Sequence, residues 1–121
     1  MFITDNYGAY QCPQIEEFKE RIREVFGRTD NEIWISENDD PDDMPCMGIL
    51  VKGDQAVINY FNTDVNYVSA NKDKQDGTVE FCNGMYEILK EQILPKEDVI
   101  RCAMEFFSDK ACPKCIEWEK L

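Results

Sequence analysis

Apolar side chains recur with a helical period in two segments of the chain. In residues 13–26 they fall on one face of a helix, while charged residues occupy the other faces. The apolar positions of this first segment are Ile15, Phe18, Ile22, Val25 and Phe26. Pro13 suits the first helical position, and Gly27 suits the stop. A second helix is predicted to begin near Pro95 and to end before Pro113, with Val99, Cys102, Ala103, Phe106 and Phe107 as its buried stripe.

Between these two segments, short apolar runs are separated by turn residues. The runs predict strands at residues 33–35, 48–51, 56–61, 65–70, 78–82 and 85–89. Gly53-Asp54 and Asn83-Gly84 are pairs suited to tight hairpin turns, so we expect an antiparallel meander. The tail, residues 115–119, alternates between apolar and polar and predicts a final strand. The fold class is therefore α+β, an antiparallel sheet of about five or six strands with two helices packed on it.

The length of the chain, 121 residues, predicts a single domain spanning residues 1–121. The N-terminus lacks the basic and long apolar regions of a signal peptide. No apolar run approaches the roughly 18 residues that a membrane helix needs. We therefore expect a cytoplasmic protein whose six cysteines are reduced thiols, several of them filling the core.

Charge and composition narrow the classes of function. The 25 acidic and 13 basic residues give a formal net charge of −12, which argues against nucleic acid or an anionic membrane as partner and favours a basic protein. The chain contains no histidine, which excludes Ser-His-Asp and Cys-His catalysis and histidine-ligated zinc. Nothing in the pattern places two carboxylates at the working separation of a glycosidase-like hydrolase. We therefore predict a binding protein rather than an enzyme, without cofactor or bound metal.

The most strongly charged segment, residues 37–43, holds five carboxylates in seven residues: Glu37, Asp39, Asp40, Asp42 and Asp43. Three interpretations are open, namely a solvated loop, a cation site and an arm that enters a basic groove on a partner. The segment does not have the spacing of an EF-hand calcium loop, since no glycine stands at the sixth position and no glutamate closes a twelve-residue loop. Crowded negative charges repel one another and gain from meeting Lys or Arg. These five residues are our candidate partner-binding residues, and exposed positions on the open face of the sheet come second.

Two further features carry alternatives. Cys112-Pro113-Lys114-Cys115 is a C-x-x-C motif, which leaves open a redox pair or half of a zinc site. Its place after a helix, near the C-terminus, differs from that of a thioredoxin-like motif, which argues against a redox role. We therefore keep a redox or metal-binding protein only as the alternative function. Trp34 and Trp118 lie in short predicted strands, where aromatic side chains are more often in the core than at an interface.

Several short motifs together resemble those of a known family. In the C-terminal third they are Ala103, Glu105-Phe106-Phe107, Pro113 and Ile116-Glu117-Trp118. Upstream, they are Gly48-Ile49-Leu50-Val51, Gly53-Asp54, Ala56 and Tyr60, which resemble the central hairpin of that family. On these motifs, which cover residues 33–119, the chain resembles the first-numbered family of polymorphic-toxin immunity proteins, here called the Imm-one family.

The resemblance implies a cytoplasmic protein that lacks catalysis and binds one cognate toxin domain encoded beside it. The toxins of this family commonly act on nucleic acid, as deaminases or nucleases, and family association favours a deaminase. An enzyme of that kind carries a basic groove, which an acidic protein can occlude. We therefore predict an immunity protein that covers the toxin's active site. A DNA-mimic inhibitor of host enzymes and a structural adaptor are the remaining binding-protein hypotheses.

Overall fold

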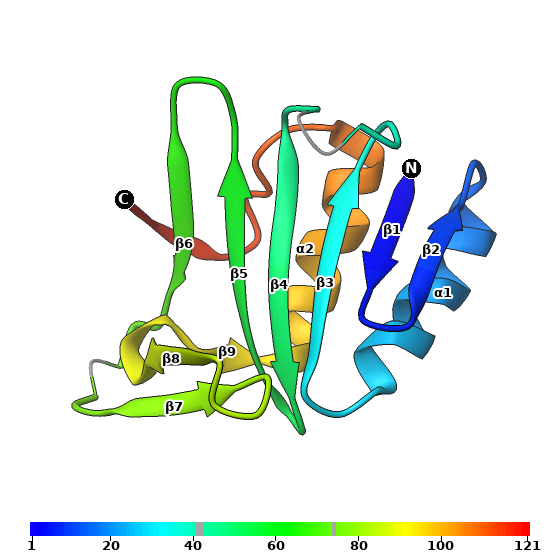
Figure 1. The fold of residues 1–121 in the computed structure, drawn as a ribbon. Coiled ribbons are helices and arrows are strands. Elements are labelled where there is room, and N and C mark those ends of the chain that lie inside the picture. The colour runs from blue at the N-terminus through cyan, green and yellow to red at the C-terminus, as the bar shows by residue number, and fades with distance from the viewer. Residues whose placement is uncertain (41–42, 74) are drawn as a thin grey trace.

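The computed structural model describes residues 1–40, 43–73 and 75–121. Its helices are α1 (Ile15–Gly27) and α2 (Lys96–Asp109), with a short 3-10 helix η1 (Lys90–Gln92). Its strands are β1 (Phe2–Asp5), β2 (Gly8–Gln11), β3 (Asn31–Ser36), β4 (Cys46–Lys52), β5 (Gln55–Phe61), β6 (Asn66–Ala70), β7 (Thr78–Phe81), β8 (Tyr86–Leu89), β9 (Leu94–Pro95) and β10 (Glu117–Lys120). Both helices pack on one face of a large antiparallel sheet, which confirms the predicted α+β class (Figure 1).

The sheet is built around a meander of four strands. The strand order is β10-β6-β5-β4-β3-β1-β2, and β9 pairs with one end of β5. Strands β3 to β6 are neighbours both in the chain and in the sheet. Among these pairings, the hairpin signal Gly53-Asp54 predicted that of β4 with β5. The hairpin β1–β2 extends the sheet beyond β3 and was not predicted, because its two four-residue strands show little alternation. The amides of Tyr7 and Gly8 donate to Asp5 Oδ1 at 2.9 and 3.0 Å, and this fixes its turn.

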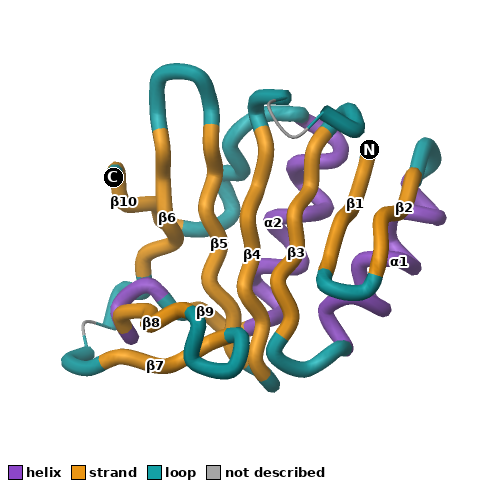
Figure 2. The backbone as a smooth tube through the Cα atoms, viewed as in Figure 1, coloured by secondary structure: helices purple, strands orange, loops and turns teal. Residues whose placement is uncertain are grey.

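The predicted strands at 78–82 and 85–89 form a hairpin, but it leaves the meander. β7 and β8 make a separate two-stranded sheet at the end of the main sheet where β4 finishes (Figure 2). The Asp30 carboxylate fastens its turn by accepting hydrogen bonds from the amides of Cys82 and Asn83. Lys52 Nζ, at the end of β4, donates to the carbonyl of Glu80 at 2.9 Å. These contacts come from segments far apart in the chain, so local patterns did not reveal them.

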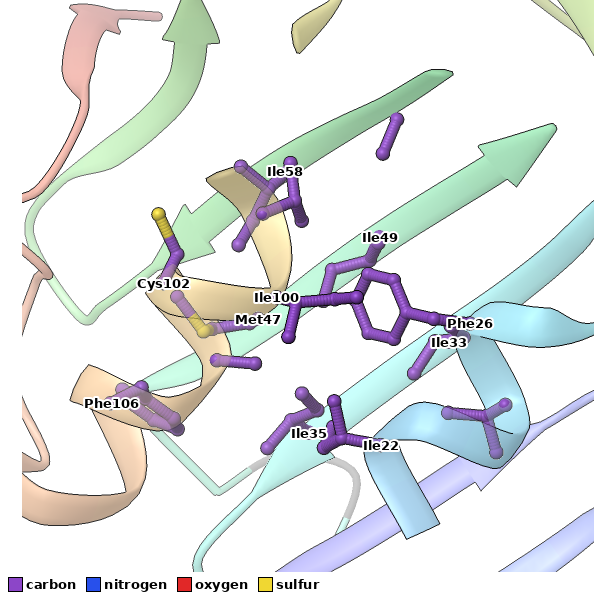
Figure 3. Packing of buried hydrophobic residues seen from close by; sticks show 14 of the residues in the cluster. Ile22, Phe26, Ile33, Ile35, Met47, Ile49, Ile58, Ile100, Cys102 and Phe106 are labelled. Atoms are coloured by element: carbon purple, nitrogen blue, oxygen red, sulfur yellow. The ribbon is translucent and has the colours of Figure 1, made fainter. Parts of the chain in front are cut away.

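The main core lies between the two helices and the sheet. Figure 3 shows Ile22 and Phe26 of α1 and Ile100, Cys102 and Phe106 of α2 gathered with side chains of the sheet in one cluster. The sheet contributes Ile33, Ile35, Met47, Ile49 and Ile58, all at most 1% exposed. Full burial of side chains of this size contributes roughly 1.5–3 kcal/mol each. The predicted apolar stripes of both helices are thus confirmed as core positions.

Helix α2 ends at Asp109, four residues before Pro113, the residue that was predicted to limit it. Lys110, directly after α2, takes a left-handed conformation, and its amide donates to the carbonyl of Phe106 at 2.8 Å. The chain then turns through residues 111–116 and enters β10, whose Trp118 packs against Tyr60 and Tyr67. Among the described residues, neither helix combines the length and the apolar character that crossing a membrane requires.

Candidate functional site

The face of the sheet opposite the helices carries an exposed tryptophan. In β3, Ile33 and Ile35 are fully buried beneath the helices, and Trp34 between them is 42% exposed. Successive side chains of a strand point to opposite faces, so Trp34 stands on the open face. The register places Trp34 opposite Gly48 of β4, which in turn pairs with Asn59 of β5.

Gly48 provides the space in which the Trp34 ring lies. A Cβ atom added at Gly48 would meet ring carbons Cζ3 and Cη2 of Trp34 at 2.9 Å, closer than real Cβ contacts allow. The indole therefore extends over β4, where only a hydrogen atom stands beneath it. It stacks on Phe61 of β5, with ring centroids 5.8 Å apart and planes inclined by 22°. Three adjacent strands thus build one aromatic surface.

Glu32 connects this aromatic surface to the β7–β8 hairpin. Its Oε1 accepts hydrogen bonds from Trp34 Nε1 at 3.3 Å and from the Tyr86 hydroxyl at 2.9 Å. The hydrogen bond to Glu32, followed by burial, raises the pKa of Tyr86, because loss of the proton would place two negative charges side by side. Glu32 therefore orients the indole and marks the border between the part of the open face that the hairpin covers and the part that carries Trp34.

A pocket of about 370 Å³ opens beside Trp34, between the ends of β1, β3 and β4 and the acidic segment. Its lining residues are Phe2, Thr4, Trp34, Ile35, Ser36, Asp39, Asp40 and Cys46. Phe2, Trp34, Ile35 and Cys46 give the pocket an apolar and aromatic part, and Asp39 and Asp40 add two acidic residues to its lining. Such a combination suits a side chain with an apolar stem and a cationic head, because Lys and Arg bury their stems and keep their charge near an aromatic face or a carboxylate.

The predicted partner-binding residues of segment 37–43 have different surroundings in the structure. Asp39 and Asp40 line the Trp34 pocket. Glu37 pairs with Lys110 at 3.3 Å, beside a different hollow that Met1 and Phe107 also line. Asp43 accepts hydrogen bonds from the backbone and side-chain nitrogens of Asn38 at 3.2 and 3.1 Å. Asp42 lies outside the described residues.

The interpretation of the two strand tryptophans was right for one of them. Trp118 is half-buried, and its Nε1 donates to the carbonyl of Pro113 at 2.7 Å. Trp34 is not in the core, so the core assignment was wrong for this residue. The signal was present in the sequence: Trp34 stands between two isoleucines, which must take the opposite face of the strand.

The cysteines of the C-x-x-C motif are not arranged as its spacing implied. All six cysteines are free thiols, and Cys115 Sγ lies 3.2 Å from the Sγ of Cys102 in α2. Cys112 directs its thiol to the carbonyl of Pro113 at 3.9 Å, and burial raises its pKa. Among residues 1–40, 43–73 and 75–121, no group of three Cys, Asp or Glu side chains is arranged to hold a metal ion.

Comparison with known proteins adds a relative of similar length. No family model matches the chain. In an alignment of 127 positions that covers all of both chains, the chain is 25% identical to a double-stranded DNA deaminase immunity protein of Burkholderia cenocepacia (strain H111). This full-length similarity confirms the resemblance to the polymorphic-toxin immunity proteins that the sequence motifs indicated.

Proposed function

We propose that this protein is an immunity protein that binds a deaminase toxin domain and blocks its active site, with no catalysis of its own. The observation that carries the proposal is the full-length similarity to a deaminase immunity protein. Inhibition by occlusion needs only affinity, supplied by a large interface with slow dissociation. Because a toxin that attacks DNA must be met inside the cell that it enters, we propose that the protein acts in the cytoplasm.

The part of the open face around Trp34 is the proposed centre of the toxin interface. Exposed tryptophans are enriched among the residues that dominate binding energy at interfaces. Here the indole is positioned in advance by Gly48, Phe61 and Glu32, so little side-chain freedom remains to be lost on binding. The stacked rings would form the apolar centre of the interface, with polar residues around it.

The carboxylates beside the pocket give this face its preference for a basic partner. Asp39 and Asp40 stand next to the aromatic wall, in a chain whose net charge is −12. A deaminase that acts on DNA must present basic side chains to the phosphates of its substrate. We propose that such side chains meet Asp39 and Asp40, and that Asp42 and the neighbouring acids increase the rate of encounter.

Charge reversal at the pocket tests this proposal. The variant Asp39→Lys/Asp40→Lys should inhibit the deaminase domain encoded beside this gene less well than the wild-type protein. The association rate should fall roughly 10- to 100-fold at low salt, and the difference should shrink as ionic strength rises. The measurements are deamination of a double-stranded DNA substrate and binding kinetics across a salt series.

A matched control separates local from global charge. Asp73→Lys/Asp76→Lys makes the same change in net charge on an exposed loop away from the pocket. It should retain inhibition and most of the association rate. Equal losses in the two double variants would show that net charge alone drives binding. Full inhibition by the Asp39→Lys/Asp40→Lys variant would remove the pocket acids from the interface, and absence of any complex with the wild-type protein would refute the immunity function.

A further inference from the structure

The thiol of Cys115, the second cysteine of the C-x-x-C motif, lies beside the thiol of Cys102, which is outside the motif. Cys102 lies on the buried face of α2, and Cys115 lies in the turn between α2 and β10. Their sulfur atoms are 3.2 Å apart, whereas a disulfide requires about 2.05 Å. Closing the bond thus needs an approach of only about 1 Å. The contact crosses from helix to turn and is not the one that the C-x-x-C spacing indicates.

The turn that carries Cys115 is held in place on both sides. Before it, the amide of Lys114 donates to the carboxylate of Glu105 on α2. After it, β10 pairs with β6, and Trp118 packs against Tyr60 of β5 and Tyr67 of β6. These contacts keep the Cys115 sulfur above that of Cys102, so the short sulfur–sulfur distance is a property of the packed structure and not of a free tail.

The two thiols differ in their access to solvent. Cys115 is exposed and can meet a small oxidant, while Cys102 is fully buried. Burial, then the hydrogen bond with Cys115 and nearby acidic groups, strongly raises the pKa of Cys102, so its proton has to leave as its sulfur forms a bond. This arrangement resembles the division of labour in thiol redox sites, with one cysteine that meets the oxidant and a second that resolves the product.

We propose that Cys102 and Cys115 form a reversible dithiol–disulfide site that a peroxide oxidises. The Cys115 sulfur attacks one peroxide oxygen and becomes a sulfenic acid, and the other oxygen leaves as water once protonated. The Cys102 sulfur then forms a bond to the Cys115 sulfur and displaces its hydroxyl group, which takes the Cys102 proton and leaves as a second water. Two thiols are oxidised by two electrons, and one peroxide is reduced to two waters.

The disulfide would fasten the C-terminal strand to the helix layer. It closes the loop between positions 102 and 115 and connects β10, a short strand at one end of the sheet, to α2 in the core. Cross-links of this loop length restrict the unfolded chain, so the oxidised protein should melt on the order of 5–10 °C above the reduced protein. This site shares no residue with the Trp34 pocket, and its existence does not depend on the proposed toxin binding.

Peptide mapping of the full chain tests the site. The reduced protein is treated with hydrogen peroxide, its remaining thiols are blocked with N-ethylmaleimide, and it is digested with trypsin without reductant. Cleavage after Arg101, Lys110, Lys114 and Lys120 places the three cysteines on separate peptides, 102–110, 111–114 and 115–120. We expect peptide 102–110 joined to peptide 115–120, and loss of both this product and the rise in melting temperature on addition of dithiothreitol.

Two single variants complete the experiment. Cys112→Ser should keep the cross-link and the thermal shift, whereas Cys115→Ser, a change at an exposed position, should fold normally and lose both. A cross-link between peptides 111–114 and 115–120 would overturn the assignment. So would over-oxidation of Cys115 to the sulfinic acid while Cys102 stays a blockable thiol.

Discussion

The two faces of the central sheet take alternate residues of the same strands and use them differently. Toward the helices, β3 supplies Ile33 and Ile35 to a core without solvent access. Toward the open side, it supplies Trp34, which remains 42% exposed and stacks on Phe61. The comparison shows that a strand of six residues can supply a buried core and an exposed aromatic surface at once, because its pleat separates the two sets of side chains.

The open face is itself divided into two parts. Near the end of β4, the β7–β8 hairpin lies against the sheet, held by Asp30 and Lys52, and its Phe81 is fully buried. At the opposite end of β4, the pocket beside Trp34 opens to solvent next to the acidic segment. The hairpin thus limits the proposed toxin-binding surface to one part of the face. If this division is correct, substitutions on the two faces should affect different measurements.

The largest effect on stability is expected beneath the helices. Phe106→Ala removes a fully buried ring that packs edge-on against Tyr60. It should lower the free energy of unfolding by about 3–5 kcal/mol, measured by urea denaturation. The molecules that remain folded should bind the toxin domain with unchanged affinity, because the change lies on the opposite face. A folded variant with weakened binding would show that the two faces are coupled.

The next largest effect is expected in affinity for the toxin domain when Trp34 is removed. Trp34→Ala should weaken affinity for the toxin domain by about 2 kcal/mol or more, roughly 30-fold, and change the free energy of unfolding by about 1 kcal/mol. Calorimetry or surface-based kinetics measures the first, and urea denaturation the second. Leu89→Ala is the control, because Leu89 is an apolar residue of similar exposure, 45%, on β8. Equal losses at the two positions would argue against a binding centre at Trp34.

A smaller change moves the indole without removing it. Gly48→Ala introduces a Cβ atom 2.9 Å from the Trp34 ring, so the ring must tilt away from β4 and off Phe61. We expect an affinity loss of roughly 3- to 10-fold and a shift in tryptophan fluorescence, at a stability cost of about 1 kcal/mol. Gly27→Ala is the control, since a Cβ atom there meets no atom within 4 Å. Wild-type affinity in Gly48→Ala would show that the orientation of the ring is unimportant.

The smallest effect is expected in the pH dependence of stability, and it comes from Asp5, on the helix-covered face of the sheet. Burial opposes ionisation of the Asp5 side chain, but the hydrogen bonds that it accepts, from Asn31 and Tyr7 first, outweigh this and lower its pKa below the ordinary 3.8. A lowered pKa in the folded state stabilises the protein above pH 3.8, and this stabilisation is lost as the pH falls through the folded-state value. Asp5→Asn should therefore be less stable at neutral pH and show a flatter loss of stability below pH 3.8.

A control at an exposed acid isolates the contribution of Asp5. Asp64→Asn removes the same charge from a turn between β5 and β6. Its stability profile, measured by urea denaturation from pH 2 to 7, should run parallel to that of the wild-type protein. Equal acid profiles for Asp5→Asn and the wild-type protein would refute the role of the Asp5 carboxylate.

Much of the fold followed from local patterns in the chain. The helical stripe that includes Ile22 and Phe26, and the alternation around Ile33 and Ile35, identify the helices and the central strands because periodicity records which face is buried. The Gly53-Asp54 turn indicated the central β4–β5 hairpin, and the resemblance to the immunity family agreed with the full-length relative. These features depend on residues a few positions apart, so the sequence alone was sufficient for them.

Tertiary structure decided which residues meet across the chain. The space over Gly48 that receives Trp34 depends on the register of β3 with β4. The place of Asp39 at the pocket and the pairing of Glu37 with Lys110 depend on where the acidic segment passes the sheet and the end of α2. Likewise, Cys115 meets Cys102 because the turn after α2 folds back on the helix. Composition and periodicity determined the classes of element and the acidic character of the chain. The positions of side chains at the sites depended on long-range pairing, which no local pattern encodes.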